Sequence, residues 1–541
     1  MQYNESYTVK PNEGRTTSMA LIDEFTTQYG LVKKMDAFGY LERLRKDPGQ
    51  PRKQGRVILV TADTPLKASR GEGKTTTTIA LIDALRARGV DAAAVLRQPS
   101  MGITAAGSKG GASGGGKASL THPELVDWGL TGEMSAIEAA QNLLASFAEK
   151  AVDDGIIDTV LVPRVCEVPS RSARQIAVDR GKGDVPERMV LTPASEMMQI
   201  VVLSRSMDEL GRRVAAMVAG TKDGKPVRFG EFIELWRITG ILHDAVKPVL
   251  TETVNGSPVY VHGGPFANVS LGIPTLVSVD MACALHDVVV VEAGYGADAG
   301  AQKWLDIACR EYGAQWPAAA VVVTRASTWR DDPELQWRYP FHVNRLESIG
   351  IPTFPLINLW EGEDGQVDSL RQTARSLGFR TPIVGNLFRD GGLALSGQLD
   401  DFVSVLGIGP TGEVQHAESS APSAVATARM ADKTSHRGVD VLDEARWLAS
   451  SAYGVSENHV LLKPGFEESL EDARRLCLQA EVNIDDLAFL AVKSPATMTD
   501  DDRVAQGERT VTLKKVDPHF GAGLLHVSLT TSLTTPMPKI V

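Results

Sequence analysis

The sequence is poor in cysteine and in aromatic residues, and it carries no excess of positive charge. Its 541 residues include 4 cysteines, none of them in a CxxC pair, and 6% aromatic residues. A disulfide-stapled secreted domain and a cysteine-rich zinc site are therefore excluded. Asp and Glu number 67 against 56 for Lys and Arg, so the net charge of −11 argues against a nucleic-acid partner.

Long hydrophobic runs are absent as well. No apolar stretch reaches the length of a membrane span, and the N-terminus lacks the charged lead and apolar core of a secretory signal. We therefore expect a cytoplasmic protein with reduced, buried thiols and no membrane partner. Because 43% of the residues are apolar, the chain can bury large cores. It should divide into about two to four domains.

A phosphate-binding pattern is present in residues 55–89. An apolar, β-branched run at 57–60 predicts a buried parallel strand, a Gly-rich turn follows, and apolar residues then recur at helical spacing. A strand, turn and helix in this order hold phosphate groups at the helix N-terminus. The predicted nucleotide-binding residues of this loop are Gly71, Glu72, Gly73, Lys74, Thr75 and Thr76.

The residue types in this loop suit phosphate binding. Gly71 and Gly73 let backbone amides turn toward an anion, and the Lys74 ammonium provides a point charge for the terminal phosphates. Thr75 is placed to bind Mg²⁺. Ala68 stands where the strict pattern has glycine, so a loop that keeps only the shape is the alternative. We predict that the loop binds ATP or GTP.

Two further predicted strands end in polar residues. The strand at 91–96 ends at Arg97 and Gln98 and is followed by a glycine-rich stretch. We predict that residues 107–116 line and cover a substrate site, with a flexible linker as the alternative. A strand at 156–162 ends near Arg164, where open α/β sheets place ligands, although plain surface charge is the alternative.

A histidine and several carboxylates follow two other predicted strands. His262 and two glycines come after the strand at 259–261, and Glu292 and Gly296 come after the strand at 287–291. A histidine and carboxylates at such strand ends form a candidate site. A lone histidine on an apolar run is usually structural, and that remains the alternative for His262.

Single aromatic residues follow the strands at 353–357 and 381–387. They are Trp360 and Phe388, and as a pair they could hold a flat base between them. Burial of both rings in a core is the alternative.

Six segments together resemble one enzyme family. They are GEGKTTT, the Arg-x-Pro-Ser at 97–100, KGGASGGG, HGGPFAN, EAGYGADAGAQKWLDI and TTPMPK, and they span nearly the whole chain. In this combination and order the chain resembles the formate–tetrahydrofolate ligase family. HGGPFAN with EAGYGAD is the specific part, because the phosphate loop alone occurs in many families.

The resemblance implies a fold class and a domain plan. The fold is α/β, with a P-loop-type, mostly parallel sheet in a large nucleotide-binding domain and two smaller α/β domains. We expect a P-loop nucleotide- and acyl-phosphate-binding domain at 1–345 and an adenine-side α/β domain at 346–411. A linker or exposed segment at 412–437 and a C-terminal α/β domain at 438–541 would follow.

The resemblance also implies an activity. Family members use ATP to phosphorylate formate and then pass the formyl group to N10 of tetrahydrofolate. ATP and Mg²⁺ are therefore expected, a monovalent cation is left open as a further cofactor, and a homo-oligomer, either dimer or tetramer, is expected. The implied catalytic residues are Lys74, Arg97 and His262, and the further cofactor-binding residues are Gly296, Trp360 and Phe388.

Several departures from the family pattern concern the acceptor side. Gln98 stands where the family has Glu, and Lys117 stands where it has Tyr, so both are predicted acceptor-binding residues whose chemistry has changed. A relative that activates formate or another small carboxylate and acylates a non-folate amine is therefore the second hypothesis. A P-loop switch ATPase of the partitioning type is the third, although such proteins lack HGGPFAN.

Overall fold

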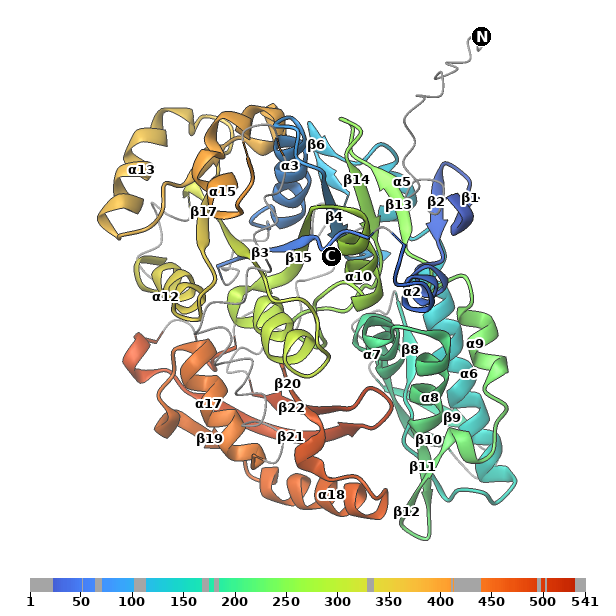
Figure 1. Ribbon diagram of the computed structural model, residues 1–541. Helices are drawn as coiled ribbons and strands as arrows, with labels where there is room; N and C mark the ends of the chain where they lie inside the picture. Colours follow the sequence, from blue (N-terminus) through green and yellow to red (C-terminus); the bar gives the residue numbers. More distant parts are fainter. Residues whose placement is uncertain are drawn as a thin grey trace.

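A ten-stranded sheet lies at the centre of the computed structural model, which has a mixed α/β architecture (Figure 1). The structure describes residues 23–50, 52–63, 71–101, 113–167, 175–179, 184–327, 335–409, 412, 439–493, 498–501 and 504–530. Within these residues, no helix is long and apolar enough to cross a bilayer.

The central sheet is mostly parallel. Its order is β1-β2-β13-β14-β4-β15-β3-β16-β17-β18. The strands from β14 to β18 in this order run parallel to their neighbours, and they are β14 (Pro258–Val261), β4 (Ala92–Leu96), β15 (Val288–Gly296), β3 (Arg56–Ala62), β16 (Ala319–Arg325), β17 (Thr353–Asn358) and β18 (Ile383–Gly385). The antiparallel edge consists of β13 (Val249–Glu252), β2 (Val32–Met35) and β1 (Thr26–Tyr29).

Both faces of this sheet are covered, which explains its continuous apolar strands. Val57 and Leu59 of β3 belong to one core cluster, and Ile58 and Val60 belong to another on the opposite face. The helices that contribute to the first cluster include α2 (Ala37–Lys46), α6 (Glu133–Asp153), α7 (Glu196–Leu203), α8 (Met207–Ala216), α9 (Trp236–Leu242), α10 (Leu276–Leu285) and α12 (Leu335–Ser348). Those of the second include α3 (Lys74–Arg86), α5 (Pro123–Asp127), α14 (Leu387–Asp390) and α15 (Asp400–Val405), and α13 (Val367–Ser376) packs in a small cluster beside β17.

Shorter elements complete the large domain. A hairpin of β5 (Gly114–Gly115) and β6 (Ala118–Ser119) lies near α3, and two π-helices, η3 (Ala297–Ala301) and η4 (Trp304–Cys309), follow β15. The 3-10 helices are η1 (Thr192–Ala194), η2 (Phe229–Glu231), η5 (Asp364–Gln366), η6 (Leu393–Gln398), η8 (Glu457–His459), η9 (Ile484–Asp486) and η10 (Gln506–Glu508).

Two small sheets lie beside α6 to α9, away from the central sheet (Figure 1). One contains β8 (Arg164–Cys166), β10 (Asp184–Leu191) and β9 (Gln175–Asp179), and the other contains β12 (Lys225–Arg228), β11 (Val218–Lys222) and β7 (Thr159–Val160). The expectation that residues 156–162 form a strand of the main sheet is wrong, because β7 pairs antiparallel with β11. Arg164 accordingly lies away from the main-sheet edge and pairs with Glu149 at 2.5 Å.

The C-terminal residues form a unit with a sheet and core of their own, drawn in orange and red in Figure 1. The sheet order is β19-β21-β22-β20, and α17 and α18 pack on it. The bounds are α17 (Val441–Tyr453), β19 (Val460–Leu462), α18 (Phe466–Gln479), β20 (Ala488–Val492), β21 (Val511–His519) and β22 (Leu524–Leu529).

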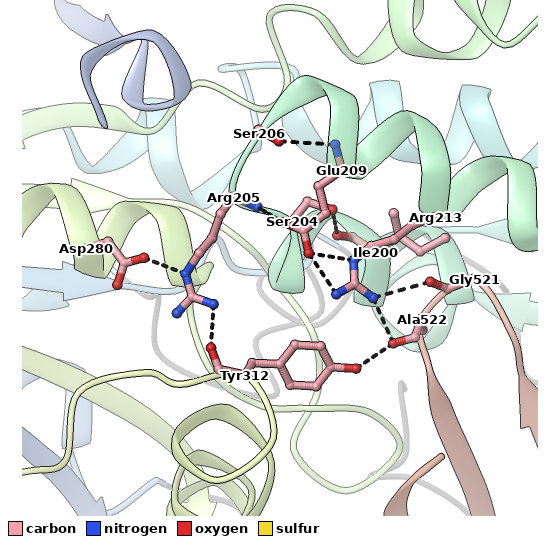
Figure 2. A network of polar contacts seen from close by, with 10 residues as sticks. All are labelled: Ile200, Ser204, Arg205, Ser206, Glu209, Arg213, Asp280, Tyr312, Gly521 and Ala522. Carbon is pink, nitrogen blue, oxygen red and sulfur yellow. Dashed lines mark hydrogen bonds and ion pairs between the residues drawn. The ribbon is translucent and has the colours of Figure 1, made fainter. Parts of the chain in front are cut away.

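A polar network joins this unit to the large domain (Figure 2). Arg213 of α8 donates to the carbonyl oxygens of Gly521 and Ala522 in the β21–β22 turn, at 3.4 and 3.2 Å. The Tyr312 hydroxyl donates to the same Ala522 oxygen at 2.8 Å. Within α8, Glu209 Oε1 lies 2.8 Å from Arg213 Nη2 and holds the guanidinium in place. The β21–β22 turn is therefore bound by an arginine that is itself paired with a carboxylate.

At the N-terminal end of the described residues, Thr26–Tyr29 forms β1, which pairs antiparallel with β2. Residues 346–411 contribute β17 and β18 to the central sheet, with α13 to α15 around them.

Candidate active site

The predicted phosphate loop, described from Gly71 onward, leads into α3 beside β3, at the centre of the parallel strands. Gly73 is the residue before α3 and has a φ of +93°, a backbone conformation that favours glycine. A Cβ at this position would lie 2.7 Å from Asn358 Nδ2 at the end of β17. Gly71 is exposed, Thr76 is half-buried in the first turn of α3, and residues 64–70, including Ala68, lie outside the described residues.

Lys74 is held at the mouth of this loop by a neighbouring carboxylate. Its Nζ lies 2.8 Å from Glu72 Oε2, and the side chains of both residues are largely buried. Asn358 donates from Nδ2 to the Glu72 carbonyl oxygen at 3.4 Å and accepts from the Leu387 amide at 3.4 Å. The end of β17 thus connects the phosphate loop to the start of α14.

Glu292 links the phosphate loop to the next strand end. Thr75 Oγ1 donates to Glu292 Oε2 at 3.0 Å, and Arg97 Nη2 donates to Glu292 Oε1 at 3.1 Å. Glu292 is 3% exposed and stands on β15, between β3 and β4. Thr75 and Arg97, which were predicted from different segments, are therefore joined through the buried carboxylate of Glu292.

Arg97 has N–H groups to spare. Its Nη1 donates to the Pro265 carbonyl oxygen at 3.1 Å, and its Nε is buried without a hydrogen-bond partner among the described residues. A guanidinium with unpaired donors suits an anion with several oxygens. Gly294 allows this position, because a Cβ there would lie 2.8 Å from Arg97 Nη1.

Tyr295 is a site residue that the sequence reasoning missed. It has a φ of +57°, which is uncommon for a tyrosine and typical of positions where surrounding structure imposes strain. Burial raises the pKa of its hydroxyl, while the nearby charges of Arg97 and Lys74 oppose this. The ring therefore lies close to the charged residues of the site. The glycines on both sides, Gly294 and Gly296, were the available signal.

Gly296 lies where the sequence placed it, at the carboxyl end of β15. It pairs with Ala62 of β3 across a shift in strand register and precedes the π-helix η3. A short π-helix in such a position often marks a functional site. Gly296 therefore stands beside the end of β3, which leads into the predicted phosphate loop.

His262 lies inside the scaffold of the site. It is 1% exposed, its Nε2 lies 2.8 Å from the Ala245 carbonyl oxygen and its Nδ1 lies 2.8 Å from Thr275 Oγ1. Burial lowers the pKa of the imidazole to about 4, so the ring is neutral at pH 7. With both ring nitrogens bonded to protein, this geometry favours a positioning role over the catalytic role expected from the sequence.

The HGG turn after β14 is also held by a buried acid. Glu133 Oε1 accepts from the Gly263 amide at 2.7 Å, and burial raises the pKa of Glu133 to about 8. Gln98 packs against the same turn, because its backbone N–H donates to the Gly263 carbonyl oxygen at 2.8 Å. Its side chain is 2% exposed and donates to the Val126 carbonyl oxygen at 2.7 Å. Its Oε1 has no partner among the described residues.

Trp360 and Phe388 follow the neighbouring strands β17 and β18. Trp360 is half-buried, with the Arg325 guanidinium 4.2 Å from its ring centroid. Phe388 is 66% exposed, and its ring lies against the β5–β6 hairpin, where a Cβ on Gly115 would be 3.1 Å from Cε2. Neither ring is in a closed core, but a sandwich of a base between them stays a prediction.

Lys117 stands on the same hairpin as the triple glycine. It is exposed, and its amide donates to the Phe388 carbonyl oxygen at 2.9 Å. The geometry thus brings Lys117 to Phe388, and no contact between Lys117 and Gln98 is found in the described part of the chain. The covering role expected for residues 107–116 falls mostly on residues 107–112, which lie outside the described residues.

Asp63 is a second residue that the sequence reasoning missed. It follows β3 directly, is 2% exposed, and accepts from Thr324 Oγ1 at 3.3 Å. Burial and the nearby charge of Glu72 raise its pKa well above the usual range, so it resembles the perturbed carboxyl groups of functional sites. Only its place after the strand could have indicated it.

The oxygen donors of this site suit Mg²⁺ better than a transition metal. In the described residues no group of three or more His, Cys, Asp or Glu side chains is placed to hold a metal ion. The Thr75 hydroxyl and the Glu292 carboxylate, 3.0 Å apart, are the hard oxygen ligands that Mg²⁺ takes together with phosphate oxygens and water. Residues and cofactor therefore fit.

Comparisons with known proteins agree on one family. A family model described as formate–tetrahydrofolate ligase matches residues 3–333. A protein of that name from Bifidobacterium longum is 73% identical over 523 residues, which cover 97% of this chain and 100% of the relative. A relative of the same name from Symbiobacterium thermophilum is 34% identical over 405 residues, covering 69% of this chain and 71% of its own length. One from Acidiphilium cryptum is 36% identical over 355 residues, covering 61% and 62%.

The segments that carry the geometry are the segments that carried the resemblance. The phosphate loop, the Arg97 strand end, the HGG turn and the β15 end all meet at the carboxyl edge of the parallel sheet. This chain therefore belongs to the formate–tetrahydrofolate ligase family.

Proposed function

We propose that this chain is an ATP-dependent ligase that joins formate to N10 of tetrahydrofolate through formyl phosphate. The observation that carries the proposal is Glu292, which joins Thr75 of the phosphate loop to Arg97 of the neighbouring strand end. Because Glu292 brings the two together, the phosphate loop can bind a nucleotide phosphate while Arg97 binds a small carboxylate beside it. The relative that is 73% identical over its whole length supports folate as the acceptor over another amine.

In the first step a formate oxygen attacks the γ-phosphorus of ATP, a P–O bond forms, and ADP leaves with its bridging oxygen. The step requires alignment and neutralisation of charge more than a base. Lys74, already held by Glu72, would place its ammonium beside the transferring group. Arg97 would orient formate through the N–H groups that the protein leaves unpaired.

When bound, Mg²⁺ would neutralise charge on the transferring phosphoryl group. The residues that would hold it are Thr75, through its hydroxyl, and Glu292, through its carboxylate. Release of Thr75 from Glu292 would free the hydroxyl oxygen for this purpose, while Arg97 keeps the carboxylate in position.

In the second step N10 of tetrahydrofolate attacks the formyl carbon, inorganic phosphate leaves, and the nitrogen loses its proton. Arg97 and Lys74 would stabilise the leaving phosphate by the same contacts that served its formation. His262 and Glu133 would act through the HGG turn, which they hold in place from inside the protein. Formyl phosphate reacts with water, so the hairpin side of the site is proposed to cover it.

The adenine ring is proposed to lie between Trp360 and Phe388. Support comes from their place at adjacent strand ends and from the exposure of Phe388, a large apolar ring that a ligand would bury. Asn358 connects this side to the phosphate loop. The base and the phosphates can therefore be held by one continuous edge of the sheet.

We also propose that the protein is a cytoplasmic homo-oligomer, either dimer or tetramer. None of the four cysteines, Cys166, Cys283, Cys309 and Cys477, forms a disulfide, which suits a reducing compartment. Light scattering at assay concentrations would give the number of chains, and a monomer at active concentrations would refute this part.

The test of the function is formation of 10-formyltetrahydrofolate from ATP, formate and tetrahydrofolate, followed as the methenyl form after acid treatment. We expect turnover that requires all three substrates and Mg²⁺, with potassium and sodium compared for the open question of a monovalent cation. Formate-dependent ADP release without a formylated folate would instead support acylation of another nucleophile. ADP release independent of any carboxylate would support a switch ATPase.

A further inference from the structure

Apart from the candidate active site, a cavity lies where the large domain meets the C-terminal unit. Its volume is about 400 Å³, and its walls come from η4, α12 and α17. This is within the range of about 300 to 1,000 Å³ typical of small-molecule sites. Asn344 and Ser348, two of the lining residues, are exposed, so solvent reaches the cavity.

Three aromatic rings and two guanidinium groups line this cavity. The rings are those of Trp316, Phe341 and Trp447, and the guanidinium groups are those of Arg310 and Arg345. Large rings favour a flat, conjugated ligand, which they can cover by stacked or edge contacts. Arginine side chains recognise carboxylate and phosphate groups through paired N–H donors.

The charged residues of the wall are partly organised already. Arg310 Nη2 lies 3.4 Å from Asp306 Oδ1, and Arg345 Nη2 lies 3.6 Å from Asp306 Oδ2. The Arg310 guanidinium also lies 5.2 Å from the Trp447 ring centroid. Arg345 also donates from Nη1 to the Ala297 carbonyl oxygen at 3.2 Å. Two guanidinium groups thus stand beside one aspartate in the wall, and an anionic ligand group would be a further acceptor for them.

Two buried polar atoms of this wall have no partner in the described part of the chain. They are Trp316 Nε1 and Ser451 Oγ. An indole N–H can only donate, and a buried donor without an acceptor costs free energy that a bound acceptor would recover. Both residues face a cavity in which a ligand nitrogen or carbonyl oxygen could accept from them.

We propose that this cavity is a second small-molecule site, which binds a flat nitrogen heterocycle carrying an anionic group. Purine nucleotides and folates share this chemistry, and the experiment separates them. None of the residues that line the cavity belongs to the candidate active site. The site therefore binds independently of ATP at the phosphate loop.

The test is isothermal titration calorimetry of the full-length protein with two probes, AMP and folic acid. AMP is titrated with and without a saturating non-hydrolysable ATP analogue and Mg²⁺. For a probe bound in the cavity, Trp316→Phe keeps one aromatic ring but removes the indole N–H donor, and should weaken binding about tenfold, the effect of one hydrogen bond. Ser451→Phe fills the space and should abolish binding.

Matched controls separate lost binding from lost folding. Trp236→Phe makes the same change at an exposed tryptophan and should leave binding unchanged. Trp316→Phe removes an unpartnered buried donor, so its melting temperature should not fall, and it keeps the test valid if Ser451→Phe does not fold.

The outcome also identifies the source of the ligand. AMP that remains bound beside the ATP analogue and is weakened by Trp316→Phe supports a nucleotide site. Folic acid weakened by Trp316→Phe supports a folate site. If neither probe is sensitive to Trp316→Phe, or if another part of the chain fills the cavity and no probe binds there, the proposal is overturned.

Discussion

The proposed phosphate side of the site, around Lys74, Thr75 and Arg97, and its proposed adenine side, around Trp360 and Phe388, are built in different ways. On the phosphate side, Lys74, Thr75 and Arg97 are held by the carboxylates of Glu72 and Glu292, and the contacts are 2.8 to 3.1 Å long. On the adenine side, rings stand half-buried or exposed beside a glycine hairpin. The first side is an assembled polar network, and the second is a pair of apolar surfaces.

This difference indicates how each side contributes to the reaction. Fixed charges act on the transition state, where charge is redistributed, and so they determine kcat. Exposed rings gain free energy when a ligand covers them, in the ground state and the transition state alike, and so they determine KM. Mutations on the two sides should therefore separate into two kinetic classes.

The largest effect is expected for Lys74→Ala. Removal of the ammonium beside the transferring phosphoryl group should lower kcat by about a thousandfold, as loss of a strong electrostatic contact does. The control is Lys150→Ala, which removes an exposed lysine paired with Asp154. Steady-state ADP release measures both. Near-native kcat in a folded Lys74→Ala protein would remove Lys74 from the mechanism.

Arg97→Ala should lower formate-dependent ADP release by about a hundredfold while changing the KM for ATP by less than about threefold. Arg97 is proposed to orient formate and not to bind the nucleotide, so the loss should appear in kcat. Arg446→Ala, which removes an exposed arginine of the C-terminal unit, serves as control. Weaker ATP binding with unchanged formate dependence would move Arg97 to the nucleotide.

His262 should affect the pH dependence of stability more than the chemistry. Its folded pKa of about 4 lies below the unfolded value of about 6.5, so the folded state binds fewer protons between these values. Stability contributed by neutral His262 is complete above pH 6.5 and is lost as the pH falls toward 4, by about 3 kcal/mol.

The measurement is the free energy of unfolding in urea at pH 7 and pH 4.5 for the native protein and His262→Gln. The variant should lose much less stability on acidification than the native protein does. If both lose the same amount while kcat of the variant falls steeply at neutral pH, His262 acts on the substrate, as the sequence led us to expect.

Trp360→Ala tests the adenine side. Loss of one stacking face should raise the KM for ATP by about tenfold, within the 1 to 3 kcal/mol that base stacking contributes, with little change in kcat. Trp236→Ala removes an exposed tryptophan elsewhere and should be silent. A large loss of kcat without a change in KM would break the division between the two sides.

The smallest effect is expected for Lys117→Ala. The backbone N–H of Lys117 donates to the Phe388 carbonyl oxygen, which places this residue on the proposed adenine side. Removal of its side chain should therefore change the KM for ATP by about twofold. Initial rates with ATP and tetrahydrofolate varied in turn would show which substrate responds. A larger change in the KM for tetrahydrofolate would restore the acceptor role predicted from the sequence.

The sequence predicted the phosphate side better than the rest, for a physical reason. The strand at 57–60, the glycine turn and α3 are adjacent in the chain, so local periodicity reveals them. Glu292 and Arg97 could be found as strand-end residues, since parallel strands end on the same edge. Their contact through one carboxylate depends on strand order, which no local pattern reveals.

The features that no local pattern indicates depend on contacts between segments. The ring of His262 contacts Ala245, which lies before β13, and Thr275, the N-cap of α10. Thr26–Tyr29 forms β1 by pairing with β2. Tyr295 adopts a positive φ that its residue type disfavours, so propensity argues against what tertiary structure imposes.

The most direct test of the account uses formate labelled with ¹⁸O. If a formate oxygen attacks ATP at the site formed by Lys74, Arg97 and Glu292, that oxygen remains on phosphorus when N10 displaces phosphate. Mass spectrometry of the inorganic phosphate released during turnover with tetrahydrofolate should therefore show one ¹⁸O atom per phosphate. Unlabelled phosphate, formed at the same rate as formylated folate, would contradict an acyl-phosphate intermediate and with it the proposed mechanism.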